Sequence, residues 1–166
     1  MTYSSEDILT YRSMELEFDL LIKCLYKLDV KSTANWGKMN SNQMLRHCNN
    51  FIEVSLGLKK IGLKTKIFGK VGGKLFLRYL TSINFEISRY PRNSPTLKEF
   101  KPKEIIIDFE EETMKLVKNI KQIKKIKTKF TYHQIYGKIT TDLFKKLMYF
   151  HTSYHLNQFG LLNNKS

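Results

Sequence analysis

Two histidines near the end of the sequence have the spacing of a half-formed metal site. His151 and His155 are four residues apart, so on a helix both imidazoles project from one face and are near enough to share a cation. That face is otherwise apolar, because Phe144, Met148 and Phe159 recur at helical steps. Leaving two polar rings unpaired there costs roughly 1 to 3 kcal/mol each. A shared metal removes that cost; the alternative is two core histidines bonded to carbonyl or tyrosine oxygens.

A third histidine lies on an earlier predicted helix. Asn40 is a suitable N-cap and Gln43 completes a capping box, so we predict a helix that runs to about Leu56 and is stopped by Gly57. His47 is among its inward-facing positions. Alone, it would be interpreted as a structural histidine, but together with the later pair it becomes the candidate third ligand.

The rest of the chain must position these helices. Apolar periodicity predicts a first helix from about Ser13 to Leu28, and Asp108 is a candidate N-cap for another. The last helix is expected from Thr140 to Gly160. Residues 58–103, rich in glycine and proline, are predicted to be mostly irregular, with a short helix at about Val71–Leu80.

These elements predict an all-α fold: one domain over residues 1–166, with its core at 12–160. The four long helices form an up-down-down-up four-helix bundle, because a connection of about 45 residues between the second and third is needed only if they run parallel. The helices of His47 and His155 are then antiparallel, and the two histidines lie at matching depths. His133 precedes the last helix, so we expect a loop histidine at the opposite end of the bundle.

The net charge of +14 raises the question of an anionic partner such as nucleic acid. Of the 29 basic residues 24 are lysine, whereas base readout and bidentate phosphate contacts favour arginine. We therefore do not expect a dedicated nucleic-acid partner.

The N-terminus lacks a signal segment and no apolar run is long enough for a membrane span, so we expect a cytoplasmic protein without a membrane partner. Cys24 and Cys48 are expected to be thiols.

Four strings of the sequence, in order, resemble the DinB-like superfamily of metalloenzymes, also called DinB/YfiT-like, and within it a branch catalogued as a domain of unknown function. The strings are Trp36–Cys48, Tyr90–Thr96, Tyr136–Thr140 and His151–Gly160. The resemblance covers about residues 12–160. It implies a four-helix bundle that binds a divalent metal, zinc or nickel, through His47, His151 and His155. Its relatives include thiol-dependent S-transferases and a maleylpyruvate isomerase.

The site chemistry points to an enzyme on independent grounds. Three neutral imidazoles leave a coordination position for water or substrate, and a metal held this way lowers the pKa of bound water or thiol. We expect a divalent-metal-dependent transferase or hydrolase that activates a thiol or water for attack on a small electrophile. A low-molecular-weight thiol is the candidate co-substrate. The alternatives are a non-catalytic metal- or ligand-binding module and a nucleic-acid-associated basic protein; a homodimer is also left open.

Other residues are candidates for supporting roles. Gln43, one turn before the first histidine, and Gln158, three residues after the last, are suited to orient a ligand imidazole or bound water. Trp36, Arg92 and Tyr154 are expected at the mouth of the pocket, with Arg92 a candidate for binding an anionic substrate group. No acidic residue of the two histidine helices clearly faces the metal, so the catalytic residue is left open.

Overall fold

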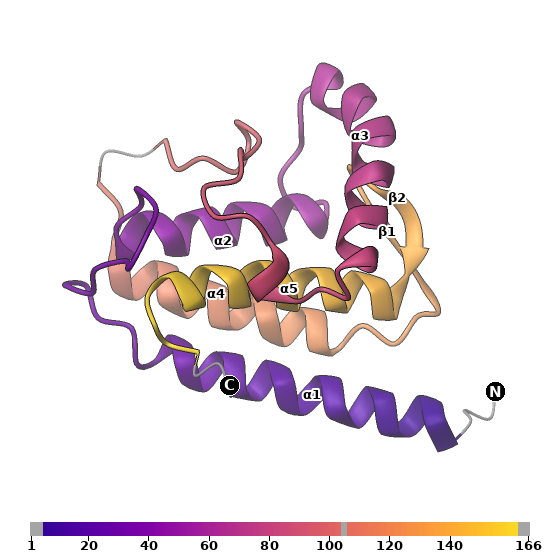
Figure 1. Ribbon diagram of the computed structural model, residues 1–166, viewed down its shortest axis with the longest axis horizontal. Coiled ribbons are helices and arrows are strands. Elements are labelled where there is room, and N and C mark those ends of the chain that lie inside the picture. The colour runs from indigo at the N-terminus through magenta and orange to yellow at the C-terminus, as the bar shows by residue number, and fades with distance from the viewer. Residues whose placement is uncertain (1–4, 104–105, 163–166) are drawn as a thin grey trace.

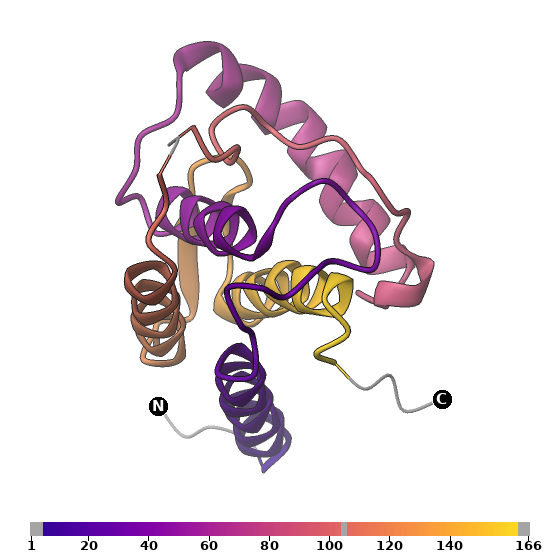
Figure 2. The same cartoon turned by 90° about the vertical axis from the view of Figure 1, so that its left-hand side faces the viewer.

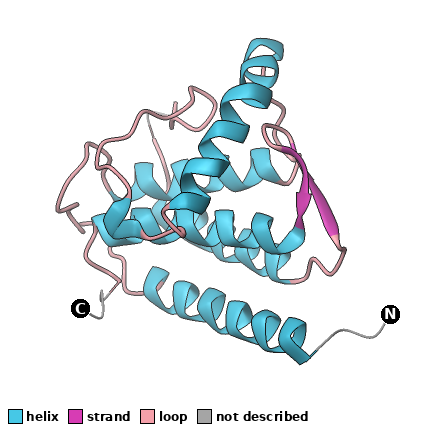
Figure 3. Ribbon diagram, turned by 45° about the vertical axis from the view of Figure 1, so that its right-hand side comes forward, coloured by secondary structure: helices cyan, strands magenta, loops and turns pink. Residues whose placement is uncertain are grey.

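Residues 5–103 and 106–162 are described by the computed structural model, and they form six helices and one β-hairpin (Figures 1 and 3). The elements in chain order are α1 (Ser5–Leu25), α2 (Ser41–Ser55), α3 (Leu63–Ser82), the 3-10 helix η1 (Ile87–Arg89), α4 (Phe109–Lys124), β1 (Phe130–His133), β2 (Gly137–Thr140) and α5 (Thr141–Gln158). The prediction of a mostly helical protein is confirmed. The all-α class is corrected by the antiparallel hairpin, which pairs Phe130 with Thr140 and His133 with Gly137.

Four of the five α-helices of the described residues, α1, α2, α4 and α5, surround the main core. α2 packs against α4 and α5, and α1 packs against the same two helices from the other side (Figure 2). Large, fully buried side chains from all four helices meet there, including Phe18, Met44, Leu116 and Phe144. α2 and α5, which carry the three histidines of interest, are thereby held next to each other.

Local capping sets where three of these helices begin. Asn40 and Gln43 form the predicted capping box: the Gln43 amide donates to Asn40 Oδ1 (2.9 Å) and the Asn40 amide to Gln43 Oε1 (3.2 Å). Asp108 accepts from the backbone of Glu111, and Thr140 accepts from the backbone at the start of α5. The predicted starts of α2, α4 and α5 are confirmed.

A buried polar cluster joins α2 to α4 just after His47. Asn49 Nδ2 donates to the backbone oxygen of Glu112 (2.9 Å) and to its carboxylate (2.8 Å), while Asn119 donates to Asn49 Oδ1 (2.9 Å). Arg46 pairs with the same carboxylate at 2.9 Å. Sliding α2 along α4 would separate these buried groups, so the cluster holds the position of His47 along the helix axis.

The segment predicted to be mostly irregular contains a complete helix, which corrects that prediction. α3 covers 20 residues instead of about ten, and it runs across the other long helices (Figure 1). Its glycines permit close packing on the hairpin: a Cβ at Gly69 would lie 2.9 Å from Ile135, and one at Gly73 would lie 2.8 Å from Tyr136. The glycines that suggested a loop therefore mark a helix contact.

His133 ends strand β1 and is buried, whereas a loop position was expected. Its Nδ1 accepts from the Ile135 amide (3.0 Å), so Nε2 carries the proton and donates to Ser55 Oγ (2.8 Å). Burial lowers the pKa of His133 to about 3. His133 lies beside Ser55, the last residue of α2, and beside Phe144, near the start of α5, so it is at the end of the bundle where it was expected, but in a strand and not in a loop. Phe51 contacts both His133 and His151, with ring centroids 6.3 and 3.8 Å away.

None of the helices in the described ranges combines the length and apolar character needed to cross a lipid bilayer.

Candidate metal centre

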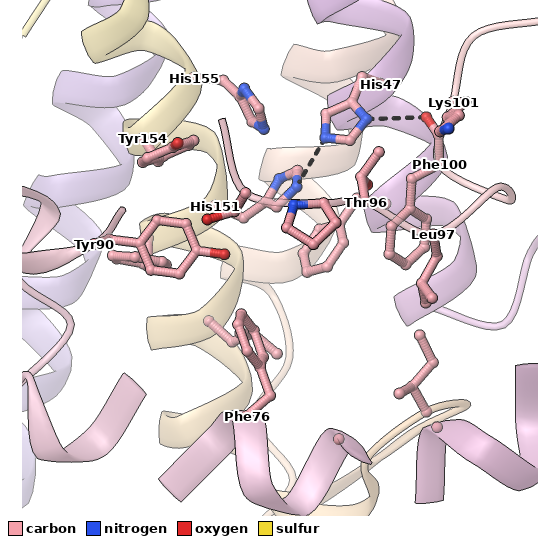
Figure 4. Close-up of a pocket in the computed structure, with 18 of the residues that line it drawn as sticks. His47, Phe76, Tyr90, Thr96, Leu97, Phe100, Lys101, His151, Tyr154 and His155 are labelled. Carbon is pink, nitrogen blue, oxygen red and sulfur yellow. Dashed lines mark hydrogen bonds between the residues drawn. The ribbon is translucent and has the colours of Figure 1, made fainter. Parts of the chain in front are cut away.

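His47 from α2 and His151 and His155 from α5 converge on one point (Figure 4). One nitrogen from each ring lies within 4.8 Å of the other two, and the Nε2 atoms of His47 and His151 are 3.2 Å apart. Two imidazole nitrogens on one tetrahedral zinc ion are about 3.3 Å apart, since each Zn–N bond is about 2.05 Å. The separation of the His47 and His151 nitrogens therefore matches that of two ligands on one ion, and the three rings together could hold a divalent ion.

Two of the three rings are oriented by a partner behind them. His47 Nδ1 lies 3.0 Å from the backbone oxygen of Phe100, and His155 Nδ1 lies 2.6 Å from Gln158 Oε1. Both partners are acceptors, so each Nδ1 carries the proton and each Nε2 offers a lone pair. A hydrogen bond to the outer ring nitrogen is the usual support of a histidine that binds a metal.

His151 is held by stacking instead. Its ring lies flat on Phe51, with 3.8 Å between centroids and 10° between planes, and its buried Nδ1 has no hydrogen-bond partner. Because His47 Nε2 carries a lone pair, its 3.2 Å approach to His151 Nε2 requires a proton on His151 or a cation between the two atoms. The contact is compatible with a shared ion.

All three rings are neutral at pH 7. Burial lowers the pKa of His47 to about 4 and that of His155 to about 3, and His47 further lowers the latter by repulsion. Burial, together with repulsion from the other two rings, also holds the pKa of His151 well below its usual value. Neutral imidazole is the form that binds metals, so no proton has to be removed from a charged ring at neutral pH.

The histidines form part of the wall of a cavity of about 1060 Å³. α3 forms another wall, and the segment from Tyr90 to Pro102 contributes further lining residues. Aromatic side chains predominate near the cluster, and Figure 4 shows Phe76, Tyr90 and Phe100 around the space into which the imidazoles face. A substrate in this cavity would contact both the imidazoles and an apolar surface.

Only some of the candidate supporting residues contact the histidine cluster or line its cavity. Gln158 contacts His155, as described above, whereas the Gln43 side-chain oxygen caps α2. Tyr154 lines the cavity, but its hydroxyl donates to a backbone oxygen, that of Pro91 (3.1 Å). Trp36 packs against the Tyr154 ring at 5.0 Å, and Arg92 lies 5.4 Å from the Trp36 ring. Neither of these two side chains is part of the cavity wall.

Two features of the site had no signal in the sequence. The Phe100 carbonyl orients His47, but a backbone oxygen is present at every residue and so has no sequence signature. Phe51 lies one turn after His47 on the same helix, but nothing in the sequence indicates that its ring stacks on His151. Both contacts bring together parts of the chain that are distant in sequence.

No curated protein and no solved structure matches the chain significantly. A family model matches residues 9–161, nearly all of the sequence and all three histidines of the cluster. The chain belongs to this family, DUF1569, which is described as a protein of unknown function.

Proposed function

We propose that the protein is a metal-dependent enzyme that activates a thiol or a water molecule for attack on an electrophile. The observation that carries the proposal is the convergence of three neutral imidazoles on a large cavity, two of them with the proton held on the outer nitrogen. A structural site would be closed by a fourth protein ligand, and within the described residues the cluster contains three.

A divalent ion held by His47, His151 and His155 would supply a coordination position at which water or a thiol has a lowered pKa. The residues of the chain supply the surroundings. Phe51 and Phe100 exclude water from one side of the cluster, which strengthens electrostatic interactions there. The Tyr90 hydroxyl points into the cavity (Figure 4), and burial raises its pKa, so it remains a hydrogen-bond donor at pH 7.

The resemblance to the DinB-like superfamily supports the same proposal. Its members carry one histidine on the second long helix and a pair on the last. α2 and α5 carry His47 and the pair His151 and His155 in that order. We extend the proposal to the fold: α1, α2, α4 and α5 correspond to the four helices of a DinB-like bundle, and α3 lies in the long crossover between its second and third helices.

Metal content tests the first half of the proposal. Protein purified without an affinity tag should bind about one equivalent of zinc or nickel, measured by elemental analysis and by calorimetric titration after chelation. The variants His151→Ala and His155→Ala should lose this binding. His133→Gln is the matched control, since it alters a buried histidine outside the cluster. Unchanged metal binding in both cluster variants would disprove the assignment.

Activity tests the second half. The metal-loaded protein should accelerate consumption of a low-molecular-weight thiol by an aromatic electrophile such as monochlorobimane, or hydrolysis of an activated ester. The chelated protein and His155→Ala should not. Metal binding without turnover of either substrate type would leave a metal-binding protein and contradict the enzymatic proposal.

A further inference from the structure

The lining of the large cavity has a distribution of charge that defines a class of ligand. Among the residues that the structure describes, the side chains that line it include three lysines, Lys38, Lys64 and Lys101, and no aspartate or glutamate. All three lysines are exposed, so they lie where the cavity meets solvent. They make the opening of the cavity electropositive.

The carboxylate of Glu99 lies beside this wall, because its partner Thr65 is a lining residue, and it offsets part of the charge. It accepts from Thr65 Oγ1 at 2.5 Å, next to the first turn of α3. No side chain caps this helix, because Gly62 occupies the N-cap position. A negative charge there interacts favourably with the helix N-terminus. Three lysines outnumber this one carboxylate, so the opening remains electropositive.

Deeper in the cavity the lining is apolar. Its surface comes mainly from aromatic and aliphatic side chains, namely Phe51, Phe76, Leu80, Phe100, Ile135, Leu147 and Phe150. Leu80 and Leu147 are almost completely buried, so this wall is part of the protein core. A ligand that displaces water from it gains about 25 cal/mol for each square ångström of apolar surface covered.

Gly72 leaves additional room on the α3 side. A Cβ built at this residue would meet no atom within 4 Å, although Gly69 and Gly73 on the same helix are tightly packed. The glycine therefore borders open space where almost any other residue would project a side chain. Gly72 is one of the lining residues of the cavity, so a larger side chain at this position would be placed beside the ligand.

We infer that the cavity binds an amphipathic anion, a molecule with an extended apolar body and one anionic end such as a carboxylate. The apolar body lies along the Phe76 and Phe100 wall beneath the histidine cluster, and the anionic end lies at Lys64 and Lys101. The inference rests on the cavity of the proposed function and names the substrate class for it. Binding of the anion does not require the metal. The ligand assignment and the metal-dependent function can therefore fail independently.

The test compares three probes of equal chain length on chelated protein: decanoate, decanol and decyltrimethylammonium. Equilibrium dialysis or calorimetry should show that decanoate binds about 3- to 10-fold more tightly than decanol, the range expected for two solvent-exposed charge pairs, and that the cation binds most weakly. Butyrate, which keeps the charge but lacks the body, should bind far more weakly than decanoate. Equal affinity for the three ten-carbon probes, a preference for the cation, or no binding would overturn the inference.

Variants separate the two parts of the ligand. Lys64→Gln combined with Lys101→Gln should abolish the preference for decanoate over decanol, whereas Lys118→Gln with Lys121→Gln, which removes two charges from exposed positions of α4, should preserve it. A preference that survives the first pair would overturn the placement of the anionic end.

Gly72→Leu should weaken binding of decanoate and decanol alike by filling the open space, and Gly72→Ala is the control for the change in helix propensity. Circular dichroism verifies that each variant is folded. Unchanged affinity of the folded leucine variant for both probes would contradict the placement of the apolar body.

Discussion

Gly37 lies so close to Gln158 that a Cβ atom on the glycine would be 2.7 Å from Gln158 Nε2. The backbone at Gly37 has φ of +96°, a region that residues with a side chain rarely adopt. Nearby, the Asn35 amide donates to the Gln158 backbone oxygen at 2.7 Å. The loop before α2 and the residue that orients His155 therefore pack together, and a glycine far from His155 in sequence helps to hold the metal-binding geometry.

Replacing Gly37 by alanine should lower metal affinity by about tenfold, because the new methyl group displaces Gln158 and frees the His155 ring. Calorimetric titration with zinc measures the effect. Gly57→Ala is the matched control: Gly57 also has positive φ, of +77°, but a Cβ there would meet no atom within 4 Å. Both variants carry backbone strain, and only the first should affect the metal. Equal affinities in the two variants would show that Gly37 acts through strain alone.

Gln158→Leu should reduce zinc affinity by about 10- to 100-fold, the usual effect of losing the hydrogen-bond partner of a ligand histidine. The buried His155 Nδ1–H would then lack its acceptor. Gln158→Glu keeps an acceptor oxygen at this position and should bind zinc at least as tightly as the unchanged protein. The contrast between the two variants, measured by competition with a chromophoric chelator, distinguishes a specific hydrogen bond from general packing. Weak binding by both would favour packing.

His133 should make the protein less stable as the pH falls below about 6.5. Its pKa is about 3 in the folded protein and near 6.5 when unfolded, so in this interval the unfolded chain binds a proton that the folded chain does not. The contribution of His133 to the free energy of unfolding is fully present above pH 6.5 and is lost as the pH falls toward 3. Urea unfolding of chelated protein should show a free energy that falls about 1.4 kcal/mol per pH unit more steeply in the parent than in His133→Gln. Parallel pH profiles would contradict the buried neutral ring.

Alanine should have opposite effects at two neighbouring glycines of α3. Gly72→Ala should stabilise the protein by about 0.5 to 1 kcal/mol, because alanine favours the helix and its methyl group has free space. Gly73→Ala should destabilise it by about 1 to 3 kcal/mol, because the methyl group would lie 2.8 Å from the Tyr136 ring and push α3 from the hairpin. Urea midpoints measure both. Stabilisation by both substitutions would mean that α3 does not pack closely on the hairpin.

The sequence was sufficient for features that depend on a few adjacent residues. Asn40, Asp108 and Thr140 each bind a backbone amide three residues later, so the starts of three helices follow from local chemistry. In the same way, the helical repeat determines that His151 and His155 project from one face of their helix. These interactions span one turn of helix, and their residue types recur in many proteins.

The glycines of α3 show where local reasoning fails. Glycine lowers helix propensity by about 1 kcal/mol per residue, so Gly69, Gly72 and Gly73 favoured a loop with only a short helix. At Gly69 and Gly73, contact with Ile135 and Tyr136, more than 60 residues later, offsets this cost. The β-hairpin was missed for a related reason: its strands have four residues each, too few for an alternating pattern to stand out.

The joining of His47 to His151 across 104 residues depended on how α2 packs beside α5, which a helical repeat within either segment does not specify. The same holds for the Phe100 oxygen behind His47 and for the apolar wall of the cavity. Side-chain spacing acts over one helical turn, whereas the position of one helix against another results from burial of many side chains at once. Residue types therefore indicated the chemistry, and the packing of distant segments determined the geometry in which that chemistry is available.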